Sequence, residues 1–186
     1  MRISPRYLLP ALLLCFPLAA QAIETDGDYW IIHSQGSAGN NLAFVADADP
    51  AHISKRAGGV VSLGVHKVYQ NTGNGFLTAH EIEVDCAKKR VRIKRADEID
   101  GPMGGVRPVK ISSAWQTQPE AWLVNSRDFI CQPQQRTGEG MIPIGSMEML
   151  RMIDAVRAYF TVLGREQARA AILKEIDDAF ARMPQP

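Results

Sequence analysis

The chain has 186 residues and a formal net charge of +1, and 22% of its residues are charged. This length suits one domain with an appendage at most. The balanced charge gives no sign of nucleic-acid binding. Beyond the first 22 residues, no apolar run approaches the ~20 residues that a transmembrane helix needs. We therefore expect a protein that binds no nucleic acid and does not span a membrane.

The first 22 residues, MRISPRYLLPALLLCFPLAAQA, have the layout of a secretory signal peptide. Arg2 and Arg6 precede an apolar run, and the small residues Ala20 and Ala22 form a cleavage site at its end. Cleavage there leaves 164 residues with 19 basic and 20 acidic side chains. We predict export, either to the periplasm or to the cell surface and medium.

Cleavage also removes Cys15 and leaves two cysteines, Cys86 and Cys131. The competing interpretations are a metal site and a catalytic thiol. A zinc site would need about four closely spaced ligands, and a catalytic thiol would need a base in a recognisable context. The sequence offers neither, which favours a structural disulfide in an oxidising compartment, with no metal and no cofactor.

Alternation of apolar and polar residues predicts β-strands through the first part of the exported chain. The predicted strands are 29–33, 42–46, 60–69, 76–86 and 91–96, and turn residues such as NTGNG separate them. A loop at 101–118 follows, and then two short apolar pieces at 121–124 and 128–131. We predict an antiparallel meander of about six strands.

The clearest predicted hairpin surrounds Cys86. On the strand that leads to it, apolar residues alternate with Glu83 and Asp85. A four-residue turn after Cys86 would place Asp85 opposite Arg92 and Glu83 opposite Lys94. Such cross-strand pairs of opposite charge contribute ~0.2–1 kcal/mol each. This register predicts a solvent-exposed face of the hairpin on which part of the charge is neutralised by cross-strand pairs.

Basic residues exceed acidic residues after this turn, eight against three over residues 88–110. Such a patch can attract acidic glycans, lipopolysaccharide phosphates or acidic proteins, although its spacing specifies none of them. The alternative is a solvated strand edge whose charges discourage aggregation. The candidate ligand-binding residues are Lys88, Lys89, Arg90 and Arg95.

From residue 143 the apolar period becomes helical. Ser146 is a predicted N-cap, and Gly164 is predicted to end or kink the first of two helices. Each helix carries an apolar stripe that must be buried on the sheet or against a partner, which would allow a homodimer through the helices. The stripes comprise Met149, Met152, Ile153, Val156, Tyr159, Phe160 and Leu163, and then Ala168, Ala171, Ile172, Ile176, Ala179, Phe180 and Met183.

Four stretches resemble the bacterial surface-adhesin protein E domain. They are GDYWIIHS near the start of the exported chain, IEVDCAKKRVRI, AWQTQPEAW and RDFIC. The likeness covers roughly residues 27–131. It implies an antiparallel sheet packed on a helix, a disulfide between the matching Cys86 and Cys131, and adhesion to host matrix proteins.

The predicted fold class is therefore α+β. Residues 1–22 form the signal peptide, 23–142 a disulfide-stapled antiparallel β domain similar to the adhesin family, and 143–186 a C-terminal pair of amphipathic helices packed on the sheet or on a partner. The predicted function is a non-enzymatic binding module of the adhesin type, secreted, periplasmic or on the cell surface.

The alternative is a small periplasmic enzyme, such as a hydrolase, with a histidine and a carboxylate in its site. The candidates are His66 or His80 beside Glu81 or Glu83. Strand alternation directs His80 away from both glutamates. For His66 the sequence assigns no partner.

Overall fold

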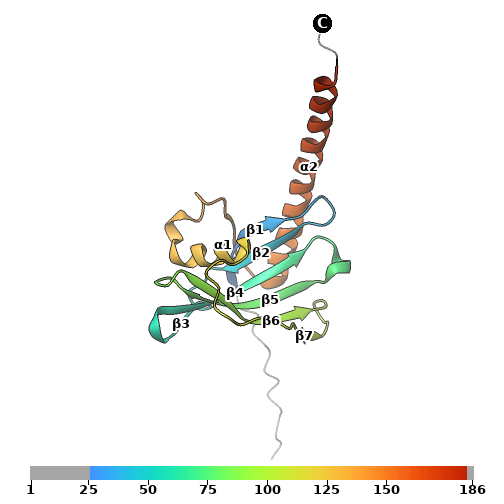
Figure 1. Cartoon of the computed structure of the whole chain (residues 1–186). Helices are drawn as coiled ribbons and strands as arrows, with labels where there is room; N and C mark the ends of the chain where they lie inside the picture. The colour runs from blue at the N-terminus through green and yellow to red at the C-terminus, as the bar shows by residue number, and fades with distance from the viewer. Residues whose placement is uncertain (1–25, 184–186) are drawn as a thin grey trace, which may run out of the picture.

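The computed structural model describes residues 26–183, so the predicted signal peptide lies outside the described residues. Over this range the chain forms one antiparallel sheet and two α-helices (Figure 1), which confirms the α+β class. The strands are β1 (Gly27–Gln35), β2 (Leu42–Asp47), β3 (Ser54–Lys55), β4 (Val60–Tyr69), β5 (Leu77–Asp85), β6 (Arg90–Ile99), β7 (Val106–Pro108) and β8 (Ile142–Met147). The helices are α1 (Ala121–Cys131) and α2 (Met149–Ala181).

The strand order is β7-β6-β5-β4-β2-β1-β8, and the short β3 pairs with β4. Most neighbours in sequence are neighbours in the sheet, as a meander requires, whereas β8 returns from far along the chain to pair with β1. The predicted count of about six strands is too low because β3 and β7 are only two and three residues long, and because β8 contains a proline and a glycine that are atypical of strands. β8 is an edge strand, where a proline such as Pro143 is tolerated. The predicted domain boundary between residues 142 and 143 falls inside this strand.

The β5–β6 hairpin differs in register from the prediction. Asp85 pairs with Arg90, and Glu83 pairs with Arg92, whereas the prediction placed these carboxylates opposite Arg92 and Lys94. The turn begins at the cysteine itself and not after it. Since side chains alternate with period two, this shift by two positions leaves the apolar and charged faces unchanged. Alternation alone could not distinguish the two registers.

One face of the sheet carries a core that α1 covers. The Trp122 ring stacks on Phe44 with 4.4 Å between ring centroids, and Phe129 is completely buried. The helix contacts β1, β5 and β6. The buried residues of this core are Ile32, Phe44, Ala46, Leu63, Val65, Ile82, Val84, Val91, Trp122, Leu123, Phe129 and Met141.

Helix α1 unites the two apolar pieces at 121–124 and 128–131 that the sequence analysis kept separate. Its buried residues Trp122, Ser126 and Phe129 follow a helical spacing. The polar Ser126 interrupts the apolar pattern, and its buried hydroxyl donates a hydrogen bond to the Trp122 carbonyl at 2.8 Å. The residues alone therefore did not reveal the helix, although the family resemblance implies one.

The first half of α2 covers part of the opposite face of the sheet. Met152, Ile153, Val156 and Phe160 are buried there, as the first predicted stripe requires. The strand residues in this second core are Tyr29, Ile31, Ala43, Val45, Val68 and Leu77.

Two predictions about α2 are wrong. Ser146 belongs to β8, and the residue at the N-cap position is Glu148. Moreover, α2 continues through Gly164 as one helix of 33 residues, since one interior glycine costs only ~1 kcal/mol of helix stability. Its C-terminal half rises clear of the sheet (Figure 1). The second stripe is therefore exposed, with relative exposures of 45–66% for Ile172, Ile176, Phe180 and Met183.

Candidate functional site

A disulfide joins Cys86, which follows β5, to Cys131 at the end of α1, with 5.6 Å between the two Cα atoms. This confirms the predicted pairing. The bond links positions 45 residues apart, and chain-entropy arguments assign such a loop a stabilisation of about 4 kcal/mol. Disulfides persist in oxidising compartments, which indicates an extracellular or periplasmic protein. No helix in the described part of the chain has the length and apolarity needed to cross a membrane.

Asp85 organises the turn between β5 and β6. Its carboxylate accepts hydrogen bonds from the Lys88 backbone N–H and from Arg90 Nε, each at 3.1 Å. Desolvation opposes ionisation of this carboxyl, but these two bonds and the nearby cations outweigh it and lower the pKa of Asp85. Lys89 completes the turn with a φ of 48°. The tip of the turn is thus held by the disulfide at Cys86 and by the hydrogen bonds that the Asp85 carboxylate accepts.

The carboxylates of β5 form a row of ion pairs that we call the charge ladder: Arg56, Glu81, Glu83, Asp85, Arg90, Arg92 and Lys94. Glu83 is only 3% exposed and binds Arg92 at 2.5 Å and Arg56 at 3.2 Å. Glu81 accepts a 2.8 Å bond from Lys94. That bond is the largest of the influences that lower the pKa of Glu81.

Trp115 lies against the charge ladder. Its ring centroid is 4.5 Å from the guanidinium carbon of Arg90 and 4.6 Å from that of Arg92, distances at which cation–π attraction operates. A backbone bridge between Val91 and Gln116 holds this part of the loop against β6. The predicted solvent-exposed face is therefore partly covered by Trp115 and its loop. Sequence reasoning did not predict the contact of Trp115 with these arginines, because Trp115 comes from a loop without periodicity.

Six of the eight basic residues at 88–110 form ion pairs within the described residues. Two of the four predicted ligand-binding residues are engaged at short distance, Arg90 with Asp85 and Arg95 with Asp97 at 2.6 Å. The local excess of five positive charges falls to two once the three carboxylates of β5 are included. The structure therefore does not bring the four predicted residues together as free charges.

The other two predicted residues, Lys88 and Lys89, lie exposed in the turn itself. Lys88 Nζ is 4.0 Å from the nearest Asp85 oxygen, and its side chain is 67% exposed. For Lys89 no ion pair occurs within residues 26–183. The turn is thus the part of the predicted patch with unneutralised charge.

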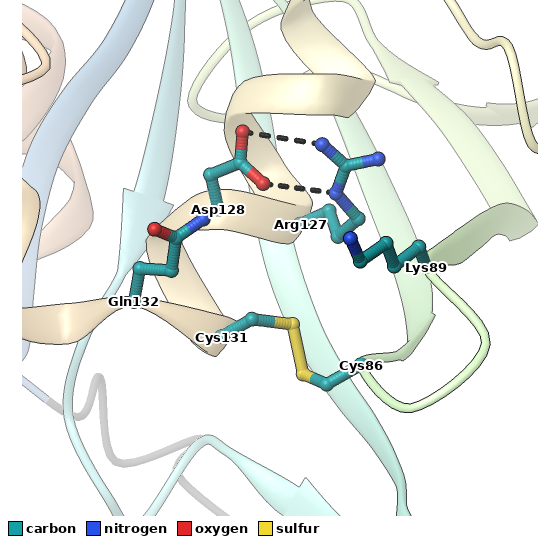
Figure 2. Close-up of a pocket in the computed structure, with 6 residues that line it drawn as sticks. All are labelled: Cys86, Lys89, Arg127, Asp128, Cys131 and Gln132. Carbon is teal, nitrogen blue, oxygen red and sulfur yellow. Dashed lines mark hydrogen bonds and ion pairs between the residues drawn. A yellow bond between two sulfur atoms is a disulfide. The ribbon is translucent and has the colours of Figure 1, made fainter.

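Lys89 borders a cleft of about 450 Å³ beside the disulfide (Figure 2). The cleft is lined by Cys86, Lys89, Arg127, Asp128, Cys131 and Gln132. Arg127 and Asp128 form a two-pronged ion pair, with N–O distances of 2.9 and 3.3 Å. The carboxyl end of α1 adds partial negative charge at this place, so the positive excess resides on the lysines of the turn. Sequence reasoning missed Arg127, because the residues alone did not reveal α1, the helix that places Arg127 about one turn before Cys131.

The histidines of the alternative enzyme hypothesis do not meet a glutamate. His80 lies on the face of α1, where its ring is 5.1 Å from that of Trp122 and Nδ1 is 3.2 Å from the Val65 carbonyl oxygen. His66 lies on the opposite face, and its buried Nδ1 has no hydrogen-bond partner among the described residues. Burial lowers the pKa of His66 to about 4. It is therefore a neutral ring in the sheet at neutral pH.

A histidine and a carboxylate do meet elsewhere, where His52 Nδ1 lies 2.5 Å from Asp47 Oδ2. The other oxygen of Asp47 accepts the backbone N–H groups of Asp28 and Asp49, at 3.0 and 2.9 Å. The carboxylate thus ties β1 to the turn that follows β2, and His52 completes that turn. The pair has a structural explanation that needs no substrate.

Within residues 26–183, no three histidine, cysteine, aspartate or glutamate side chains are grouped as metal ligands. Comparisons with protein-family models, with curated proteins and with solved structures returned no match. The likeness to the adhesin family therefore depends on the four sequence stretches quoted above.

Proposed function

We propose that this protein is an exported, non-enzymatic binding module of the adhesin type that recognises anionic groups with the β5–β6 turn. The ligand class is an acidic glycan, with lipopolysaccharide phosphates or an acidic protein as sources of the same chemistry. The observation that carries the proposal is the pair of exposed lysines, Lys88 and Lys89, on a turn fixed by a disulfide. The cleft beside Lys89 offers room for part of such a ligand, and its Arg127 and Asp128 neutralise one another.

A fixed turn favours binding because little conformational freedom remains to be lost on contact with a ligand. Asp85 and the disulfide hold the backbone, so only the two lysine side chains must become ordered. Exposed ion pairs contribute only about 0–1 kcal/mol each. We therefore expect weak, salt-sensitive binding to one site, which several sites on one polymer would strengthen.

The test compares two variants with the same loss of charge. Lys88→Gln/Lys89→Gln removes the turn lysines, and the matched control Lys55→Gln/Lys110→Gln removes two lysines that are exposed elsewhere. On heparin at low ionic strength, we expect the turn variant to elute at lower salt than the wild type and the control to elute with the wild type. If both variants eluted at equally lowered salt concentrations, retention would depend on overall charge alone, which would contradict the proposal.

Arg90 and Arg95 stay unchanged in this test because they pair with Asp85 and Asp97. Removing them would leave carboxylates without partners and confuse a binding defect with a folding defect. Repeating the measurement with lipopolysaccharide micelles and with polyaspartate separates the three sources of negative charge. In each case binding should weaken as salt rises, because the screening length falls below ~8 Å above physiological ionic strength.

The non-enzymatic part of the proposal is supported by the structural role of His52 and Asp47, which form the single histidine–carboxylate hydrogen bond in the described part of the chain. Its test is a screen of the exported protein against chromogenic esters, phosphates and glycosides. We expect no turnover above a heat-denatured sample. Turnover that disappears in His52→Gln while the fold remains intact would overturn this part and favour the hydrolase.

A further inference from the structure

From Ala158 to just beyond the end of α2, a largely apolar seam lies on the side of the helix turned away from the body. Eight positions, spaced alternately by four and three residues, form a heptad repeat. All eight are exposed. The seam consists of Ala158, Val162, Arg165, Arg169, Ile172, Ile176, Ala179 and Met183, and Leu173 and Phe180 flank it.

The seam lies opposite the part of α2 that is packed on the sheet. Phe160 is buried against the sheet, and Phe180 follows it by 20 residues, which at 100° per residue is a rotation of roughly 200°. The body-facing side of the distal half is marked by Gln167, whose side chain hydrogen-bonds to Asn41 and to the Gly36 carbonyl. The seam therefore cannot be buried by the sheet of its own molecule while α2 is straight.

We propose that the seam is a dimer interface, on which the same seam of a second copy lies antiparallel. In this arrangement Val162 of one copy faces Ala179 of the other, Arg165 faces Ile176, and Arg169 faces Ile172. Every layer then combines an a position with a d position, the alternation that keeps two heptad seams in register. The pairing is self-complementary, as a two-fold axis requires.

The charges of the distal helix favour the antiparallel orientation. A parallel pair would place Arg165 against Arg165 and Arg169 against Arg169 of the second copy, where like charges repel. In the antiparallel pair each arginine lays its aliphatic stem on an isoleucine. Opposite Ile176, the guanidinium of Arg165 comes level with the acidic stretch of the second copy that contains Glu175 and Asp177. The basic start of one seam thus meets the acidic end of the other.

The exposed area is sufficient for a stable pair. Six large apolar side chains of the seam and its flanks are 45–66% exposed: Val162, Ile172, Leu173, Ile176, Phe180 and Met183. Side chains of this size and exposure present about 100 Å² each, so a symmetric pair would bury roughly 1,200 Å², the lower limit for specific interfaces. A lipid surface is a poorer occupant, because residues 165–182 carry four basic and four acidic side chains and no basic face.

The first experiment measures the mass of the mature protein by light scattering and by sedimentation over a range of concentrations. We expect a concentration-dependent dimer for the wild type and a monomer for Ile172→Lys/Ile176→Lys. Both isoleucines are exposed in the protomer, so the variant should fold normally. The matched control Ala170→Lys/Ala181→Lys adds the same charge outside the seam and should remain dimeric. A monomeric wild type, or a seam variant as dimeric as the control, would overturn the proposal.

The second experiment determines the orientation by disulfide cross-linking. In the antiparallel pair, Val162→Cys/Ala179→Cys should form covalent dimers under mild oxidation, whereas Ala179→Cys alone should not. Efficient cross-linking of Ala179→Cys alone would indicate a parallel pair and overturn the antiparallel register. Co-sedimentation of the wild type with phosphatidylethanolamine–phosphatidylglycerol vesicles, lost in the seam variant, would assign the seam to lipid and overturn the proposed dimer.

Discussion

His66 shows how burial decides the chemistry of a single residue. Its ring lies in β4 against Tyr29, with 6.2 Å between ring centroids. Burial lowers its pKa to about 4, and the attraction of Asp47 is a smaller, opposing influence. The ring therefore stays neutral at neutral pH. Its buried Nδ1 has no hydrogen-bond partner within residues 26–183, which destabilises the fold unless apolar packing compensates.

This low pKa makes stability depend on pH. An unfolded histidine binds its proton near pH 6.5, whereas His66 in the folded protein binds it only near 4. The contribution of His66 to the free energy of unfolding therefore falls by up to about 3 kcal/mol as the pH drops from about 6.5 to 4. Below pH 4 this contribution no longer changes. Asp85 and Glu81 act in a lower window, because their pKa values are lowered and their contribution is lost only when they become protonated.

The measurement is the free energy of unfolding by urea at several pH values between about 7 and about 4.5. We expect it to fall with pH in the wild type and in the control His33→Asn, and to fall clearly less in His66→Phe, which keeps an aromatic ring beside Tyr29. The same slope in all three proteins would show that His66 does not govern this window.

The candidate site also shows which of its residues a sequence can reveal. Lys88 and Lys89 could be identified because a hairpin turn is a local pattern and exposes its tip. Arg127 and Trp115 could not, since they approach β6 and the turn from distant segments by way of the disulfide and a backbone bridge. The neutralisation of Arg90 by Asp85 depends likewise on a register that alternation leaves undetermined.

At the scale of elements, long alternating strands were predictable, and the continuity of α2 was not. The apolar pattern of α2 moves to the other side of the helix between Phe160 and Ile172, which in sequence resembles a break at Gly164. In the structure the helix continues and the environment changes instead, from sheet to solvent. An apolar pattern in the sequence cannot distinguish the start of a new helix from one straight helix whose surroundings change along its length.

Replacing Gly164 by alanine tests this continuity. A Cβ atom at this position would meet nothing within 4 Å, so the change should stabilise the helix by about 0.5–1 kcal/mol. We expect an increase in helical circular dichroism and no loss of solubility. Gly164→Pro should instead cost about 3 kcal/mol or more and reduce the helical signal. A destabilising Gly164→Ala would indicate a break at this residue.

The disulfide connects two elements and should dominate the thermal stability of the sheet and α1. For Cys86→Ser/Cys131→Ser we expect a loss of about 4 kcal/mol, which in a domain of this size lowers Tm by roughly 10 °C. The check is calorimetry of both proteins, together with thiol titration of the denatured, unreduced wild type. Two reactive thiols in that titration, or an unchanged Tm, would contradict this account.

At the scale of the whole molecule, the sheet is covered from both sides but by unequal means. On one face α1 is fixed by the disulfide, and on the other only the first half of α2 reaches the core. The distal half adds little to the protomer beyond the contacts of Gln167. The first half of α2 thus stabilises the protomer, and the distal half remains available for the dimer proposed above.

Two truncations separate these roles. Ending the chain after Gln167 keeps the buried stripe and the contacts to Asn41, so the protein should be soluble and monomeric, with a Tm within a few degrees of that of the wild-type monomer. Ending it after Gly145 uncovers the second core, which includes Tyr29, Val45 and Val68. An exposed apolar patch of that kind leads to aggregation. Light scattering and thermal melts distinguish the outcomes, and a shorter form that is as soluble and stable as the longer one would show that α2 does not support the sheet.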